Sequence, residues 1–386
     1  MRFLDRQRKS FTVMVMLVLL SLFVAACGSA NGGGGSSGGG STTNGNGGKG
    51  CKKIGVLLPE TATSARWDSK DRPLLQQYIP QQLSGAHVDY NNAEGSATTQ
   101  QNQAEADLTN GDCILVVAAS DSQAAAAIVA KAKVQNVPVI AYDRLIQSKD
   151  LAYYVSFDNV KVGALQGQYI ADHYKSYVTG PGHNNVVMIN GSQTDNNAIL
   201  FRQGALSVLQ PLYDNGTLKK VYDQYTPNWD NPTAQTEMEG ALTANANNVQ
   251  IAYVANDGMA STVIAALKQQ HLNGKVLVTG QDATVTGIQN ILTGDQSMTV
   301  YKAITKEAMA TAQLVAAISN GTDTSTLTSG NTVKTSDGTP IPSVLETPVA
   351  VDKTNIQSTV LADGFVTKAD ICANLPAGTN TGGICP

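Results

Sequence analysis

The chain has 386 residues, a formal net charge of −4, and charged side chains at 15% of its positions. No basic patch stands out along it, so nucleic acid is not expected as a partner. Roughly 335 residues follow from Cys51, which is more than one hydrophobic core usually serves, and this length predicts two lobes. Aromatic residues are scarce at 5%, so the two tryptophans, Trp67 and Trp229, are candidates for binding as well as for packing.

The first 50 residues predict export followed by a tether. Residues 1–26 join a basic start to an apolar run, as a signal peptide does. The run ends in Val24-Ala25-Ala26-Cys27, which resembles the lipobox of bacterial lipoproteins, whose cysteine carries the lipid. The alternatives are an ordinary signal peptide or a membrane span, but a span needs about 20 apolar residues and this run is shorter. Residues 27–50 are otherwise mostly Gly, Ser, Asn and Thr, which predicts a flexible tether.

Four further cysteines suggest disulfides, because an exported protein meets an oxidising environment. Cys51 and Cys113 each precede an apolar strand, and neighbouring parallel strands would bring them together. Cys372 and Cys385 are paired across the C-terminal tail. No C-x-x-C occurs and histidines number only four, so neither a metal site nor a cofactor is expected.

From Cys51 onward, apolar strands alternate with helices of 10 to 15 residues, which predicts βαβ units and parallel sheets. The first half is expected to hold strands at 54–58, 87–90, 114–118 and 137–142, with helices at 73–83, 97–109 and 122–135. The second half is expected to hold strands at 185–189, 220–224, 250–255 and 275–279, with helices at 198–213, 233–244 and 260–270. The two halves match in detail, "LTNGDCILVVAASD" against "LTANANNVQIAYVAND", which indicates a duplicated lobe.

Polar residues stand where several of these strands end. The apolar run 137–142 ends on Asp143 and Arg144, and ligands of open α/β sheets bind beyond the carboxyl ends of strands. Asn256 and Asp282 end matched strands of the second half. The alternatives are a surface ion pair for the first two residues and a turn role for Asn256.

Eight segments carry a resemblance to a known family. They are "ARWDSKDR" (65–72), "AYDRLI" (141–146), "YYVSFDNVKVGALQ" (153–166), "TDNNAILFRQG" (194–204), "ALTANANN" (241–248), "TGQDA" (279–283), "MTVYKAIT" (298–305) and "GFV" (364–366). The chain resembles the type I periplasmic sugar-binding proteins of ABC importers, the ribose/galactose-binding superfamily, and within it the D-xylose-binding branch. The resemblance spans residues 52–368 in the family's order.

The resemblance implies an α/β fold of two doubly wound parallel-sheet lobes, joined by three crossings of the chain. The crossings are expected near 156–159, 301–304 and 347–351; composition alone would have suggested two sequential domains. The expected division is 51–156 with 303–348 for the N-terminal lobe, 157–302 with 349–370 for the C-terminal lobe, and 371–386 for a tail.

Sugars present paired hydroxyls and flat C–H faces, which charged and amide groups bond and aromatic rings cover. The resemblance implies sugar-binding roles for Arg66, Trp67, Lys70, Asp143, Arg144, Asn197, Trp229, Asn256, Asp282 and Lys302. Asp195 is expected to cap the helix that follows it. The chain departs from the motif in two places: Ala303 replaces a proline, and one extra residue separates Trp67 from Lys70.

The sequence therefore predicts a monomeric, lipid-anchored receptor outside the cytoplasm that delivers one monosaccharide to an ABC permease in the membrane. D-Xylose is favoured over glucose or arabinose. A secreted carbohydrate-acting enzyme is the competing class, since paired carboxylates also fit a glycosidase. However, the chain has no P-loop, no G-x-G-x-x-G after a strand and no G-x-S-x-G. A sugar-responsive repressor would need a helix-turn-helix where this chain has its signal.

Overall fold

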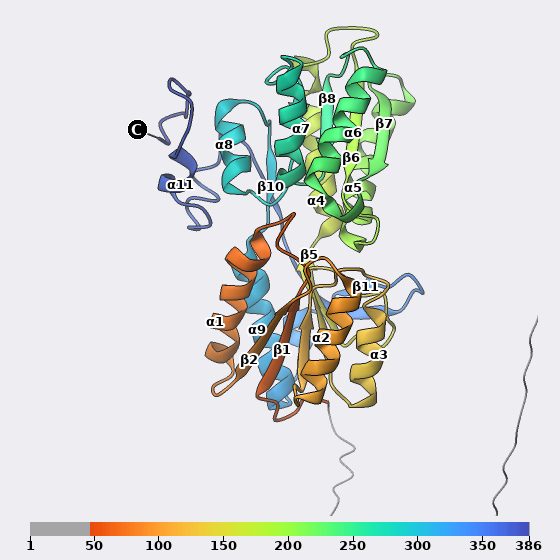
Figure 1. The fold of residues 1–386 in the computed structure, drawn as a ribbon, viewed down its shortest axis with the longest axis vertical. Helices are drawn as coiled ribbons and strands as arrows, with labels where there is room; N and C mark the ends of the chain where they lie inside the picture. Colours follow the sequence, from red (N-terminus) through yellow and green to blue (C-terminus); the bar gives the residue numbers. More distant parts are fainter. Residues whose placement is uncertain (1–46, 386) are drawn as a thin grey trace, which may run out of the picture. The chain divides into compact units, whose positions relative to one another are not determined.

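The computed structural model describes residues 47–385, which belong to one compact unit (Figure 1). The predicted signal segment, Cys27 and all of the tether before Gly47 lie outside the described residues. Within residues 47–385, no helix combines the length and the apolar character needed to cross a membrane.

The first lobe is built on a seven-stranded sheet in the order β11-β12-β5-β4-β3-β1-β2. Its strands are β1 (Lys53–Leu58), β2 (His87–Asn92), β3 (Ile114–Val117), β4 (Val139–Tyr142), β5 (Tyr153–Phe157), β11 (Thr332–Lys334) and β12 (Pro340–Glu346). All neighbours pair in parallel except the edge strand β11. Alternate side chains of β1 enter opposite cores: Val56 packs with helices α1 (Arg72–Gln82) and α9 (Ile304–Asn320), and Leu57 with α2 (Ala97–Thr109) and α3 (Ala126–Val134).

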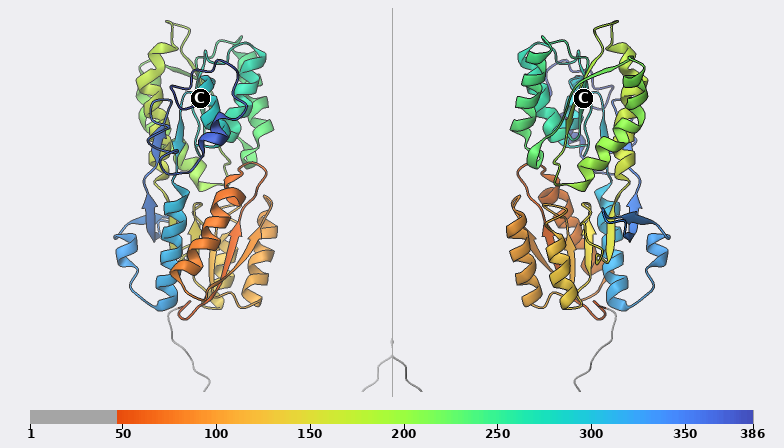
Figure 2. Two further views of the ribbon diagram at one scale, coloured as in Figure 1. Left: turned by 90° about the vertical axis from the view of Figure 1, so that its left-hand side faces the viewer. Right: turned by 90° about the vertical axis from the view of Figure 1, so that its right-hand side faces the viewer.

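The second lobe is built on a four-stranded parallel sheet in the order β7-β6-β8-β9. Its strands are β6 (Asn185–Asn190), β7 (Lys219–Tyr225), β8 (Ile251–Val254) and β9 (Leu277–Val278). Helix α4 (Asn159–His173) packs on α5 (Asn196–Asp214), and α6 (Asn231–Ala244) on α7 (Asp257–Gln269) (Figure 2). The α4–α5 contact needs glycine, because a Cβ on Gly163 would lie 1.8 Å from the carbonyl oxygen of Phe201.

The chain passes between the two lobes three times, at the places expected from the resemblance. It leaves β5 for α4, leaves β10 (Thr299–Tyr301) for α9, and leaves β12 for β13 (Val349–Val351), which pairs antiparallel with β10. The prediction of two α/β lobes joined by a three-segment hinge is confirmed. The exact lobe boundaries stay a prediction.

Several predicted elements are shorter than expected, and several short ones were not predicted. The helix expected from residue 122 begins at Ala126, because the preceding residues form tighter turns in which the N–H of Ala126 donates to the carbonyl of Gln123, three residues back (3.1 Å). The strand expected at 275–279 is reduced to Leu277–Val278. The elements missed include α8 (Val285–Thr293), α11 (Lys368–Cys372), β11 and β13, most of which are too short to show a period.

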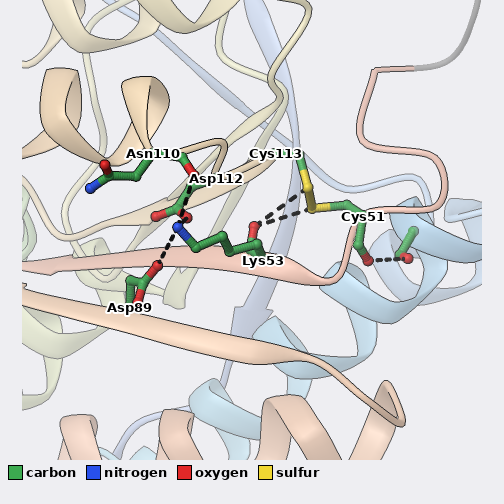
Figure 3. Close-up of a disulfide and its surroundings, with 7 residues drawn as sticks. Cys51, Lys53, Asp89, Asn110, Asp112 and Cys113 are labelled. Carbon is green, nitrogen blue, oxygen red and sulfur yellow. Dashed lines mark hydrogen bonds and ion pairs between the residues drawn. A yellow bond between two sulfur atoms is a disulfide. The ribbon is translucent and has the colours of Figure 1, made fainter.

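Two disulfides fasten the described chain, and they join the same cysteine pairs that the sequence suggested. Cys51 is bonded to Cys113 where β1 and β3 begin side by side, and Cys372 to Cys385 in the tail (Figure 3). Beside the first disulfide, the ammonium of Lys53 lies between the carboxylates of Asp89 (3.1 Å) and Asp112 (3.2 Å).

Candidate functional site

A narrow cavity lies between the two lobes, beyond the carboxyl ends of their strands, and the centre of a water-sized sphere can reach about 30 Å³ of it. Its walls are formed by Thr63, Ser64, Arg66, Trp67, Asp143, Arg144, Asp195, Asn197, Phe201, Trp229, Asn256, Gln281, Asp282 and Lys302. Every residue predicted to bind a ligand is in this set except Lys70. Polar residues at strand ends were predicted to meet at one cleft. In the structure, they lie around one cavity although they are up to 236 positions apart in the sequence (66 to 302).

Asp143 is the electrostatic centre of the cavity wall contributed by the first sheet. Its carboxylate accepts hydrogen bonds from Arg66 (3.0 Å), Lys302 (3.2 Å) and the amide of Asn197 (3.0 Å). Burial alone would raise the pKa of Asp143, but the charges of Lys302, Arg66 and Arg144 outweigh burial and hold it well below its usual range. The group is therefore an ionised acceptor at any physiological pH.

The backbone of Asp143 is held in a conformation that side-chain-bearing residues rarely adopt, with φ at +58°. Three donors fix its carbonyl oxygen: the hydroxyls of Ser156 (2.7 Å) and Tyr154 (2.9 Å) and the amide of Asn197 (3.0 Å). Trp229 (φ +59°) and Asp282 (φ +99°) are also in this region. Strain of this kind concentrates at functional sites, where the surrounding structure imposes it.

Arg66 is anchored from behind the cavity by two acids that the sequence did not single out. Its guanidinium makes a forked contact with Asp71 (2.9 and 2.7 Å) and a further one with Glu307 (3.2 Å). The hydroxyl of Tyr142 donates to the same Asp71 (2.7 Å). Burial raises the pKa of Glu307 well above its usual value, and the neighbouring Asp143 adds to the shift. Arg66 is thereby fixed before any ligand arrives.

The wall from the second sheet consists largely of groups at helix starts. Asn256 caps α7, its side-chain oxygen accepting from the backbone N–H of Met259 (2.9 Å), so its amide N–H₂ is left for another partner. Asp195 caps α5, as predicted. Asp282 has the ammonium of Lys302 3.8 Å away, and burial raises its pKa.

Asp195 does more than cap a helix. Its carboxylate lies 2.9 Å from Nε of Arg144 and accepts from the indole N–H of Trp229 (3.2 Å), so it joins the two walls. Burial raises its pKa, against the effect of Arg144. The sequence offered a signal for the cap only.

Both tryptophans are buried, and both also line the cavity, so packing and exposure to a ligand are combined in each. Trp67 is 2% and Trp229 6% exposed. The ring of Trp229 lies against Gly191, where a Cβ would come within 2.0 Å of it, and meets Phe201 edge-on. The indole N–H of Trp67 has no hydrogen-bond partner within the described part of the chain. A buried donor that faces a cavity is suited to a ligand oxygen.

The prediction that Lys70 lines the cavity needs correction. Its ammonium donates to the carbonyl of Phe365 (2.7 Å), in the segment that packs against α8. Residues Trp67–Asp71 form a π-helical turn, which takes one residue more per hydrogen-bonded ring than an α turn. The extra residue between Trp67 and Lys70 is absorbed there, and the lysine points away from the cavity.

Four lining residues carried no sequence signal. Thr63 and Ser64 belong to the loop after β1, Phe201 lies in α5 and Gln281 precedes Asp282. Phe201 also belongs to the hydrophobic core of the second lobe. Its helical spacing therefore marks it only as a core residue.

Comparison with known proteins agrees with this geometry. Residues 54–323 match the family model described as a periplasmic binding protein domain. The chain belongs to this family. It is 38% identical to the D-xylose-binding periplasmic protein of Escherichia coli over 83% of this chain and 92% of that protein. It is 36% identical to the multiple sugar-binding periplasmic protein SbpA of Azospirillum brasilense over 82% and 91%, respectively.

Among solved structures, a solute-binding protein of an ABC transporter from Clostridium phytofermentans, with bound β-D-glucose, superposes with a TM-score of 0.73. It is 30% identical, and the match covers 83% of this chain and all of the other. These relatives are binding proteins, not enzymes. By family, the protein is thus a periplasmic binding protein, and the enzyme alternative is set aside.

Proposed function

We propose that this protein is a monomeric, lipid-anchored receptor that binds one molecule of D-xylose in the cavity and delivers it to an ABC permease. The lobes close over the sugar by bending at the three crossings, since only the closed form brings both walls to it.

The observation that carries this proposal is the supply of hydrogen-bonding groups in the cavity wall that have no partner in the protein. The indole N–H of Trp67 and the amide oxygen of Gln281 are buried and unpaired within residues 47–385. Asn256 and Asp282 line the same cavity, and the amide N–H₂ of Asn256 makes no hydrogen bond within the described residues. A polyol supplies donors and acceptors in pairs and would satisfy groups of both kinds.

The size and the aromatic walls of the cavity favour a single ring. The cavity is narrow, because the centre of a water-sized sphere can reach only about 30 Å³ of it. Trp67 and Trp229 both line the cavity, and we expect their rings to cover C–H faces of a pyranose. An oligosaccharide would not fit without opening the lobes.

The choice of D-xylose rests on relatives. The Escherichia coli protein is named for xylose, whereas the Clostridium structure holds glucose and the Azospirillum protein is named for multiple sugars. Xylose and glucose differ by one hydroxymethyl group, so receptors for other monosaccharides, such as glucose or arabinose, are the second candidate.

Calorimetric titration of the purified protein with D-xylose, D-glucose, L-arabinose and D-ribose tests the assignment. We expect one site per chain, tightest for xylose, with no turnover. Tighter binding of glucose would support the receptor function but change its assigned sugar from xylose to glucose. Absence of binding by all four, or consumption of a sugar, would refute the proposal.

The anchor and the permease need a separate test in cells. We expect the protein to fractionate with membranes, and Cys27→Ser to release it while leaving sugar affinity unchanged. A wild-type protein found entirely in the soluble fraction would contradict the anchor. Loss of xylose uptake on deletion of the protein would support delivery to a permease.

A further inference from the structure

A second set of contacts joins the two lobes outside the cavity. The backbone N–H of Ser122 donates to the carbonyl of Thr194 (2.9 Å), and the hydroxyl oxygen of Ser122 accepts from the N–H of Asn196 (3.1 Å). The side-chain amide of Gln147 donates to the side-chain oxygen of Asn196 (3.0 Å). We call Ser122, Gln147, Thr194 and Asn196 the interlobe clasp. None of the four lines the cavity.

The clasp shares a segment with the cavity. In the run from Thr194 to Asn197, which leads into the first residues of α5, successive residues alternate in role, Thr194 through its backbone carbonyl. Asp195 and Asn197 line the cavity and contact Arg144 and Asp143, respectively. Thr194 and Asn196 contact the clasp residues of the first lobe. The clasp and the cavity wall are therefore joined through one short stretch of backbone.

The first-lobe half of the clasp is set in place before the second lobe arrives. The side-chain oxygen of Gln147 accepts from the N–H of Ser336 (2.7 Å), and its backbone N–H donates to the carbonyl of Ser122 (2.8 Å). These bonds orient the Gln147 amide so that its N–H₂ faces Asn196. Preorganisation of this kind lowers the entropic cost of making the contact.

We propose that the interlobe clasp sets the equilibrium between open and closed lobes, with Gln147 as a positioning residue for ligand binding. For the part that concerns sugar, the proposal rests on the proposed function. If only the closed form holds the sugar fully, the apparent dissociation constant equals the intrinsic one divided by the closed fraction. Weakening the clasp then raises the dissociation constant of every sugar by the same factor.

The test is a double-mutant cycle with Gln147→Ala and Asn196→Ala, using calorimetry with D-xylose and D-glucose and small-angle scattering with and without sugar. Each single variant should raise both dissociation constants about three- to tenfold, the range expected for one lost hydrogen bond. The double variant should add little to either single one, because both remove the same contact. The sugar-free protein should become more extended in each.

Gln168→Ala is the matched control. Gln168 lies on α4 and bonds Asp172 of the same helix on an exposed surface, so neither affinity nor scattering should change. Thermal unfolding of all variants checks that the fold is intact.

Unchanged affinity and unchanged scattering in Gln147→Ala would overturn the proposal. A change in the xylose-to-glucose affinity ratio would overturn it too, since the effect would then come from the cavity. If the wild type bound neither sugar, the proposed function would fail on its own, and scattering of the sugar-free proteins would decide the clasp. An extended Gln147→Ala would then support it, and an unchanged profile would refute it.

Discussion

The two walls of the cavity are built on different principles. On the first wall, the guanidinium of Arg66 is held between the carboxyl groups of Asp71, Asp143 and Glu307. The indole N–H of Trp67 is the group of this wall left for a ligand within the described residues. On the second wall, Asn256 and Asp282 stand at helix starts and loop ends with bonding capacity to spare. The comparison indicates that the first wall is a rigid template and the second completes its bonds when a ligand arrives.

The largest effect is expected from breaking the template. Asp143→Asn removes the charge that balances Arg66 and Lys302, so two buried cations lose their shared partner. Truncating one member of such a buried pair costs about 2–5 kcal/mol, which predicts a loss of sugar affinity of at least ~30-fold in calorimetry. Asp150→Asn, which breaks a surface pair with Lys133, is the control. Equal effects of both variants would contradict the account.

Loss of the aromatic face should weaken binding less than loss of the template. Trp229→Ala removes a buried ring of the second wall, and we expect affinity to fall about 10- to 30-fold, as for an aromatic contact residue worth roughly 2 kcal/mol. Trp229→Phe keeps a ring but loses the bond to Asp195 and should lie between. If alanine and phenylalanine behaved alike, stacking would not be the reason.

The walls should also differ in their response to acid. The pKa of Asp143 is held low, whereas burial raises that of Asp282 above its ordinary value of about 3.9. As pH falls, Asp282 takes up its proton first and loses its acceptor charge, so affinity should decrease several-fold between pH 7 and pH 4.5. Asp282→Asn should reduce this dependence; Asp195, whose pKa is also raised, accounts for the remainder. A steeper dependence in Asp282→Asn would contradict the assignment.

The smallest effect concerns stability away from the cavity. Burial, with the nearby charge of Asp112, raises the pKa of Asp107 in the first lobe to about 7. Because this pKa is higher in the folded than in the unfolded protein, the folded state binds the proton more tightly. The protein is therefore most stable at low pH, and this contribution to the free energy of unfolding is lost as pH rises toward 7. Urea unfolding should therefore show lower stability at pH 8 than at pH 5. Asp107→Asn should shrink that difference by ~1–2 kcal/mol, after allowance for screening; an unchanged difference would refute the cause.

Much of the site could be predicted because it follows strand ends. Asp143, Asn256 and Asp282 follow buried strands within four residues, and the topology of parallel sheets brings such positions to one edge. The three crossings came from the resemblance, since alternating strands and helices alone suggest sequential domains.

Other parts of the site could not be predicted. Glu307 is a buried acid on a largely buried helix, α9. Its role depends on its contact with Arg66, which is 241 positions away in the sequence. The first-lobe residues of the interlobe clasp, Ser122 and Gln147, are common loop residues whose partners lie in the other lobe. Lys70 was misplaced because a single extra residue changed the turn type. Each of these depends on tertiary contacts, which local pattern does not encode.

The most direct test of the central claim uses the tryptophans themselves. The chain has only two, and both line the cavity, so its intrinsic tryptophan fluorescence reports on that space alone. Titration with D-xylose should give a saturable, single-site change, and Trp67→Phe and Trp229→Phe should each retain part of it. A folded protein whose fluorescence does not respond to xylose, glucose, arabinose or ribose would contradict the account.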